Sequence, residues 1–184
     1  MRRALPLLAL ALGLVGLAAW LAWGRSDRPA AASWQAVDAL VRARHPDVRS
    51  VTTAELAAWL GDDSRPAPVL LDAREPAEYA VSHLPGARRV DPDAPPAALL
   101  DALADADRQR PVVVYCSVGV RSAAVAERLA AAGVADVQNL EGSVFRWAGE
   151  GRPLVRDGRP ARTVHPYSAA WGRLLRPDLR AELD

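Results

Sequence analysis

The sequence predicts an α/β fold, a parallel sheet with helices on both faces, preceded by one transmembrane helix. Two observations lead to this prediction. In the middle of the chain, short apolar runs rich in β-branched residues alternate with helical patterns, an order typical of parallel strands joined by helical crossovers. Before them, an apolar run from Ala4 to Trp23 is long enough, at about 20 residues, to cross a bilayer as a helix.

The apolar run, within residues 1–24, favours a retained signal anchor over a cleaved signal peptide. Secretory signal cores usually run about 7–15 residues, and the nearest small-residue cleavage pattern, residues 30–32, lies beyond a charged segment. Arg2, Arg3 and the terminal amine precede the run, and this positive bias predicts a cytoplasmic N-terminus. We therefore expect residues 4–23 to anchor the protein in a membrane, with its domain in the periplasm or another extracytoplasmic space; secretion after cleavage is the alternative.

Residues 25–49 are predicted to form a linker and an amphipathic helix. Ser33 is a suitable N-cap, and the apolar residues between positions 34 and 41 share one helical face before the pattern ends near His45. That face is expected to cover the domain that follows.

The predicted domain spans residues 50–155. Its first helix starts at Thr53, within the capping box Thr52-x-x-Glu55, and ends by Gly61. The expected strands cover residues 69–71, 87–90, 112–115 and 137–139. The expected later helices cover residues 97–104 and 122–132, the second capped by Gly133. The strand at 112–115 is central, and open α/β sheets bind ligands beyond the carboxyl ends of such strands.

The single cysteine lies where this central strand gives way to a loop. The chain leaves the strand at Cys116 and becomes helical at Ser122, with Gly119 at the position where a positive φ is expected. The helix N-terminus and Arg121 are expected to lower the thiol pKa below its usual value of about 8.5. The alternative, a small buried core cysteine, explains neither the glycine nor the arginine beside it.

Backbone N–H groups of this loop form a candidate binding site for an anionic sulfur. The residues that supply them are Ser117, Val118, Gly119, Val120, Arg121 and Ser122. Two roles stay open for the Arg121 side chain, because a guanidinium can bind an anionic donor at the loop mouth or pair with a carboxylate that keeps the loop rigid.

Cys116-x-x-Gly119-x-Arg121-Ser122 resembles the active-site loop of the rhodanese-like (sulfurtransferase) family. Three further segments match that family in the expected order, between Val51 and Leu154. These are Leu71-Asp72-Ala73-Arg74-Glu75-Pro76-Ala77-Glu78-Tyr79, His83-Leu84-Pro85-Gly86-Ala87, and Asn139-Leu140-Glu141-Gly142 followed by Trp147 and Arg152-Pro153-Leu154. Position 143 is Ser where many relatives carry a second Gly, a difference that we expect to have little effect.

The resemblance implies sulfur transfer through a persulfide on Cys116. The thiolate attacks the outer sulfur of a donor such as thiosulfate, and a thiol or cyanide then accepts that sulfur. Related phosphatase and arsenate-reductase loops have one residue more between cysteine and arginine than the four present here, and the smaller loop suits a single sulfur atom. A non-catalytic protein-interaction module of the same fold is the alternative, and the sequence identifies neither the physiological donor and acceptor nor the oligomeric state.

Four residues outside the loop are candidate supporting residues. Asp72 follows a predicted strand and is expected to cap a helix or brace a loop. Arg74 and Glu78, at i and i+4, are expected to pair if Pro76 opens a helical turn. His83 is expected to brace the turn that follows it rather than to act as a base.

Residues 156–184 are predicted to be an extension that packs on the domain, with a tight turn at Asp157-Gly158 and a short amphipathic helix at residues 169–175. His165 and Tyr167 are candidates to reach the active loop, without support from their spacing. No metal or cofactor is expected, because the three histidines and one cysteine show no ligand spacing and no phosphate-binding glycine motif occurs. A net charge of +1 argues against a nucleic-acid partner.

Overall fold

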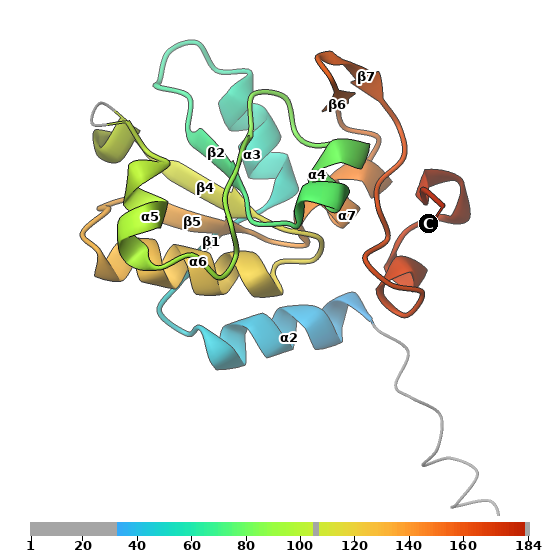
Figure 1. The fold of residues 1–184 in the computed structure, drawn as a ribbon, viewed down its shortest axis with the longest axis horizontal. Coiled ribbons are helices and arrows are strands. Elements are labelled where there is room, and N and C mark those ends of the chain that lie inside the picture. Colours follow the sequence, from blue (N-terminus) through green and yellow to red (C-terminus); the bar gives the residue numbers. More distant parts are fainter. Residues whose placement is uncertain (1–32, 105–106, 183–184) are drawn as a thin grey trace, which may run out of the picture. The chain divides into compact units, whose positions relative to one another are not determined.

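A computed structural model describes residues 33–104 and 107–182 of the chain. They form a five-stranded parallel sheet in the order β1-β5-β4-β2-β3 (Figure 1). The strands are β1 (Arg49–Val51), β2 (Val69–Asp72), β3 (Arg88–Arg89), β4 (Val112–Tyr115) and β5 (Val137–Leu140). The helices are α2 (Trp34–Arg44), α3 (Thr53–Leu60), α4 (Pro76–Val81), α5 (Pro96–Asp101), α6 (Val120–Ala131) and α7 (Ser143–Gly149). The predicted α/β fold with a parallel sheet is confirmed, and β4 is its central strand.

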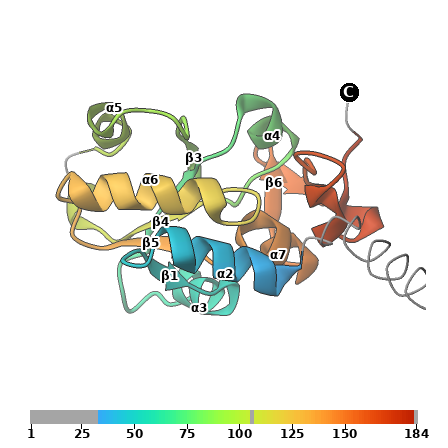
Figure 2. The same ribbon diagram turned by 90° about the horizontal axis from the view of Figure 1, so that it is seen from below.

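The core consists of two apolar layers because successive strand residues point to opposite faces of the sheet. One layer contains Leu70 and Val113 and is closed by α3 and α7, with Val37 of α2. The other contains Val112 and Val114 and is closed by α5 and α6. Figure 2 shows α5 and α6 on one side of the sheet and α3 on the other. Strand β4 is therefore buried on both faces, and the loop that follows it starts from a rigid position.

Local rules explain why several helices begin where they do. The Thr52 hydroxyl accepts the Glu55 N–H while the Glu55 carboxylate accepts the Thr52 N–H, so the capping box starts α3 at Thr53 as expected. Helix α2 begins after Ser33, whose hydroxyl accepts the Ala36 N–H at 3.2 Å. Helix α6 begins at Val120, two residues before the predicted start, because Gly119 with φ 108° occupies the N-cap position.

Two pairs of strands differ from the prediction. Strand β1 was not expected, since two of its three residues are exposed and polar, yet it pairs in parallel with β5 at the sheet edge. Strands β6 (Leu154–Arg156) and β7 (Arg159–Ala161) form an antiparallel hairpin that was predicted only as a turn. Asp157 and Gly158 at its tip have φ of 50° and 72°, the left-handed conformation that such tight hairpin turns require.

The segment after the hairpin packs on the layer that α3 and α7 close. Val164, Leu175 and Leu179 are buried there, and the Val164 N–H donates to the Leu179 carbonyl at 2.7 Å. The expected amphipathic helix at residues 169–175 is instead the short 3-10 helix η2 (Trp171–Leu174), followed by η3 (Pro177–Leu179). This segment packs closely, since a Cβ at Gly172 would lie 2.9 Å from the Pro166 Cβ. A further 3-10 helix, η1 (Asp107–Gln109), precedes β4.

The predicted membrane anchor at residues 1–24 and the linker up to residue 32 lie outside the described residues. Within residues 33–104 and 107–182, no helix combines the length and the apolar character needed to cross a bilayer.

Candidate active site

Cys116 is the first residue after β4 and lies at the carboxyl end of the sheet's central strand. The residue is 1 % exposed, and its Sγ accepts the Gly119 N–H at 3.2 Å. The positive φ of Gly119 turns the loop at this point, as its sequence position predicted. The sulfur thus lies inside a loop whose backbone donates toward it, at the start of α6.

The surroundings of Cys116 change its acidity in two opposite directions. Burial by itself raises the pKa of the thiol, because a thiolate loses hydration in the interior. The positive charge of Arg121 and hydrogen bonds from Ser122 and Gly119 outweigh burial, so the pKa lies below the ordinary thiol value. The site therefore favours a reactive thiolate over an inert buried thiol.

Arg121 folds back and pairs with Glu78, the second of the two roles left open by the sequence. Its Nη1 donates to Glu78 Oε2 at 2.7 Å and its Nη2 to Glu78 Oε1 at 2.8 Å. Ser117 joins them, since its hydroxyl donates to Glu78 Oε1 at 2.6 Å and accepts from Arg121 Nη2 at 3.0 Å. Burial raises the pKa of Glu78, but hydrogen bonds from Arg121 and Ser117 reverse this and keep the carboxylate ionised. The three side chains brace the loop after Cys116 against α4.

The prediction that Arg74 pairs with Glu78 is wrong. Helix α4 begins at Pro76 with Glu75 as its N-cap, so Arg74 lies before the helix and does not share a helical face with Glu78. Arg74 instead pairs with Asp72 through its Nε at 2.8 Å and its Nη2 at 2.6 Å, and both side chains are fully buried. Arg74 Nη2 also donates to the Ser82 carbonyl at 2.6 Å. Asp72 thus braces the chain beyond β2.

The side chain of His83 contacts the preceding helix, whereas it was expected to brace the turn that follows it. Its Nδ1 lies 3.1 Å from the Tyr79 carbonyl oxygen, and the two rings are stacked with centroids 3.8 Å apart. Its backbone also bridges to Val155 of β6. These contacts hold the segment between α4 and β3.

Two residues that the sequence analysis did not propose for the site hold the loop from below. Asn139 of β5 accepts the Ser122 hydroxyl at 2.7 Å and donates through Nδ2 to the Gly119 carbonyl at 3.1 Å. The Ser143 hydroxyl accepts the Cys116 N–H at 3.1 Å and donates to the Leu140 carbonyl at 3.1 Å. Ser143 has φ 48°, a left-handed conformation that glycine adopts at no steric cost, and its hydroxyl makes both of these hydrogen bonds.

A cavity of about 140 Å³ opens over the sulfur. Val118 and Val120 line it, whereas Gly119 and Ser122 do not line it and instead form hydrogen bonds with Asn139 of β5. Tyr167 and Trp171, from the C-terminal segment, complete its wall. The full lining is Cys116, Ser117, Val118, Val120, Arg121, Tyr167 and Trp171. Of the two residues expected as candidates to reach the loop, Tyr167 lines the cavity, and His165 accepts the Tyr167 N–H at 3.0 Å behind it. Across the described part of the chain, no cluster of three or more His, Cys, Asp or Glu side chains could hold a metal ion.

Comparison with known proteins identifies a family model that matches residues 52–150, that of the rhodanese-like domain. Over 107 residues the chain is 34% identical to the probable adenylyltransferase/sulfurtransferase MoeZ of Mycobacterium tuberculosis, covering 56% of this chain and 26% of that protein. It is 33% identical over 87 residues to a sulfurtransferase of Allochromatium vinosum, covering 47% of this chain and 78% of that protein. A crystal structure of a rhodanese-like domain protein from Staphylococcus aureus superposes with a TM-score of 0.51 at 32% identity, covering 60% of this chain and 99% of that one.

Proposed function

Because the chain belongs to the rhodanese-like domain family, we propose that it is a sulfurtransferase or persulfide carrier with Cys116 as its nucleophile. The observation that carries this proposal is the geometry at Cys116, a thiol of lowered pKa that faces a cavity and accepts a backbone N–H inside its loop. The sulfurtransferases among its relatives support the reaction class.

The proposed reaction has two steps. The Cys116 thiolate attacks the outer sulfur of a donor such as thiosulfate, a new S–S bond forms, and sulfite leaves with the electron pair of the S–S bond that breaks. A thiophilic acceptor, either a thiol or cyanide, then removes the outer sulfur and regenerates the thiolate. The Gly119 N–H and the Arg121 charge stabilise the anionic sulfur in both steps.

The neighbouring side chains are proposed to position the loop rather than to react. Glu78 and Ser117 hold Arg121 from the α4 side, and Asn139 holds the loop from β5. His83 takes no part in proton transfer in this scheme, because attack by an existing thiolate needs no base.

Intact mass spectrometry of the full chain tests this function. Incubation with thiosulfate should add the mass of one sulfur atom to the native protein, and a later addition of cyanide should remove it. The control is Cys116→Ser, which is nearly isosteric but forms no persulfide, with an unchanged circular dichroism spectrum as the check on folding. Sulfur transfer by the serine variant would contradict the role of Cys116 as nucleophile. No adduct on the native protein would favour the non-catalytic interaction module instead.

We also propose that residues 1–24 anchor the protein in a membrane with the domain on the extracytoplasmic side. The support is the apolar run from Ala4 to Trp23 behind Arg2 and Arg3. In a Gram-negative host, protease added to intact spheroplasts should digest the domain. Full protection until lysis would place the domain in the cytoplasm, and recovery of the protein without residues 1–24 from the periplasm would indicate secretion after cleavage.

A further inference from the structure

The outer wall of the cavity over Cys116 comes from outside the segment that matches the family. That match ends at residue 150, whereas Tyr167 and Trp171 belong to the C-terminal segment. Figures 1 and 2 both place this segment at the end of the domain that carries α4 and α7. Two large aromatic side chains therefore form a wall that the family's loop does not supply.

The turn that carries these aromatic rings has a defined conformation. Tyr167 has φ 63°, an uncommon conformation for a bulky residue, and its N–H donates to His165 Nδ1 at 3.0 Å. The Gly172 N–H donates to the Ser168 carbonyl at 2.8 Å and closes the turn behind Trp171. Val164 and Leu179 are buried in the core on either side of the turn, which holds both rings in the wall of the cavity that Cys116 also lines.

The charge at the cavity mouth is already paired. Among the described residues that line the cavity, Arg121 carries the only positive charge, and Glu78 engages its guanidinium through two nitrogens. The Tyr167 ring covers the same guanidinium, with its centroid 4.8 Å from the Arg121 Cζ. A dianionic donor such as thiosulfate loses its hydration when it enters the cavity. In the described part of the chain, no unpaired cation lines the cavity to compensate for this loss, so its binding is disfavoured.

We propose that the preferred sulfur donor carries an apolar group, aromatic where possible, that packs against Tyr167 and Trp171 while its outer sulfur meets Cys116. This inference rests on the proposed sulfur transfer and names its substrate class. The size of the site is suitable, because an apolar protein cavity of about 150 Å³ holds one benzene ring, and this cavity has about 140 Å³. Ring-to-ring contact with the donor adds to the burial of its apolar surface.

Benzenethiosulfonate and thiosulfate form a matched pair of probes. In each, the Cys116 thiolate attacks the terminal sulfur and a new S–S bond forms. The bond from that sulfur to the oxidised sulfur breaks, and benzenesulfinate or sulfite leaves with its electron pair. Both donors produce the same persulfide, so they differ only in the group that the aromatic wall would contact and in its charge.

The test measures kcat/KM for persulfide formation on the full chain with each donor, divided by that donor's rate with a small free thiol to remove intrinsic reactivity. We expect a preference for benzenethiosulfonate of about tenfold or more. The double variant Tyr167→Ala/Trp171→Ala should reduce this preference to about threefold or less, mainly through a higher KM for benzenethiosulfonate. Tyr167→Phe keeps the ring and should retain the preference.

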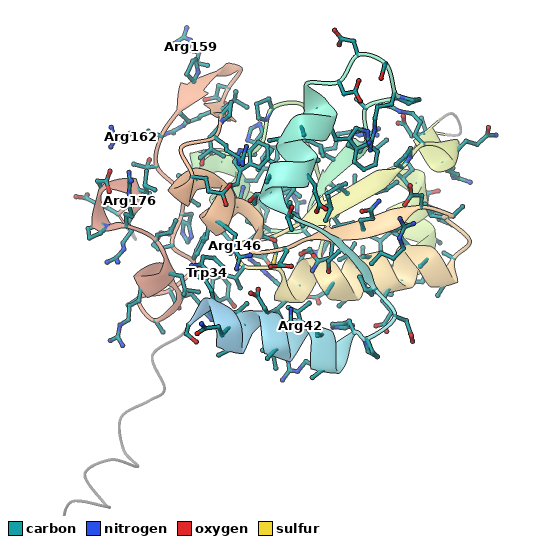
Figure 3. All side chains as sticks on the ribbon, turned by 180° about the vertical axis from the view of Figure 1, so that it is seen from behind. Trp34, Arg42, Arg146, Arg159, Arg162 and Arg176 are labelled. Carbon is teal, nitrogen blue, oxygen red and sulfur yellow. The ribbon has the colours of Figure 1, made fainter. Side chains whose placement is uncertain are left out.

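Trp34→Ala is a matched control for removing an aromatic ring beside an arginine. Its ring centroid lies 4.7 Å from the Arg146 Cζ, the same kind of contact as between Tyr167 and Arg121, and Figure 3 labels Trp34 and Arg146. Trp34 is not among the residues that line the cavity. This variant should keep the native preference. Equal use of the two donors by the native protein, or an unchanged preference in the double variant, would overturn the inference. Absence of the persulfide with both donors would instead overturn the proposed function, and the inference with it.

Discussion

Two arginine–carboxylate pairs at this end of the sheet differ in burial and in what they hold. Asp72 and Arg74 are two residues apart, are both 0 % exposed, and fix the chain beyond β2 to the Ser82 carbonyl. Glu78 and Arg121 are 43 residues apart and 2 % and 23 % exposed, and they join α4 to the nucleophile loop. The first pair faces only protein, whereas Arg121 of the second also lines the cavity.

The comparison shows that one short segment, which contains Asp72, Arg74 and Glu78, contributes both to the framework of the fold and to the candidate active site. Asp72 and Arg74 lose their hydration on folding, and Arg74 Nη1 lacks a hydrogen-bond partner among the described residues. The pair therefore fixes the path of the chain without adding net stability to the fold. Glu78 holds Arg121, whose charge lowers the pKa of Cys116, so the second pair can act on the proposed reaction through that thiol. Removing one partner of the first pair should therefore lower stability, because the other charge stays buried and unpaired, and removing one partner of the second should affect the proposed chemistry.

The largest effect is expected from Arg74→Met, which leaves the Asp72 carboxylate buried without its partner. Breaking a buried ion pair from one side costs about 3–5 kcal/mol, and urea denaturation should show this loss in the free energy of unfolding. Arg49→Met is the matched control, because Arg49 and Asp136 are 66 % and 36 % exposed and such a surface pair contributes about 0–1 kcal/mol. Similar losses of unfolding free energy in both variants would contradict the distinction between the buried Asp72–Arg74 pair and the surface Arg49–Asp136 pair.

Glu78→Gln should affect stability less and chemistry more. The amide keeps the shape of the side chain but cannot accept Arg121 through two oxygens, at a cost of about 1–3 kcal/mol in the free energy of unfolding. The loop then loses its brace, and persulfide formation at saturating donor should slow about tenfold. Glu127→Gln is the control, since Glu127 is 53 % exposed and pairs with His45. A native rate in Glu78→Gln would show that the brace is not needed for reaction.

Arg121→Gln should shift the pH dependence of persulfide formation. Burial raises the pKa of Cys116 and the Arg121 charge opposes it, so without that charge the thiol pKa rises. The rate depends on thiolate and increases with pH through this pKa, so the acidic limb of the profile should move to higher pH and the rate at neutral pH should fall severalfold. Arg121→Lys keeps the charge without the planar fork; it should slow turnover with a smaller shift, and an unmoved limb in Arg121→Gln would contradict the assignment.

The smallest effect concerns acid stability. The folded-state pKa of Glu78 is lowered, so its stabilising contribution is present above the unfolded carboxyl pKa of about 4.3 and is lost as pH falls through the lower folded value. The difference in free energy of unfolding between the native chain and Glu78→Gln should be largest at neutral pH and shrink toward acid. A difference that stays constant from neutral to acidic pH would mean that the carboxylate charge contributes nothing.

Local patterns were sufficient to predict the position of Cys116 after a strand and much of the sheet. The β-branched run before Cys116 becomes β4, and Gly119 has the positive φ expected from its place in the loop. The capping box at Thr52 defines the start of α3. Each of these rests on interactions within a few residues, which is the range over which a sequence pattern carries physical information.

The contacts that could not be predicted depend on which distant segments become neighbours. Asn139 reaches the loop only because β5 pairs with β4, placing Asn139 beside Val114. The Arg74–Glu78 prediction failed because i,i+4 spacing brings side chains together only within a helix, and α4 starts after Arg74. Trp171 reaches the cavity through the packing of the C-terminal segment, which no local pattern describes.

The dispersed origin of the site has a kinetic consequence for folding. Its parts come from α4, the loop after β4, strand β5, the start of α7 and the turn near Tyr167, so the site is complete only when elements from Glu78 to Tyr167 have assembled. Parallel pairing and long-range contacts form slowly, because loop closure must precede the contacts that stabilise it. During refolding, secondary structure should therefore return before the low-pKa thiolate does, and a thiol-reactive probe would record the time at which the chain becomes chemically competent.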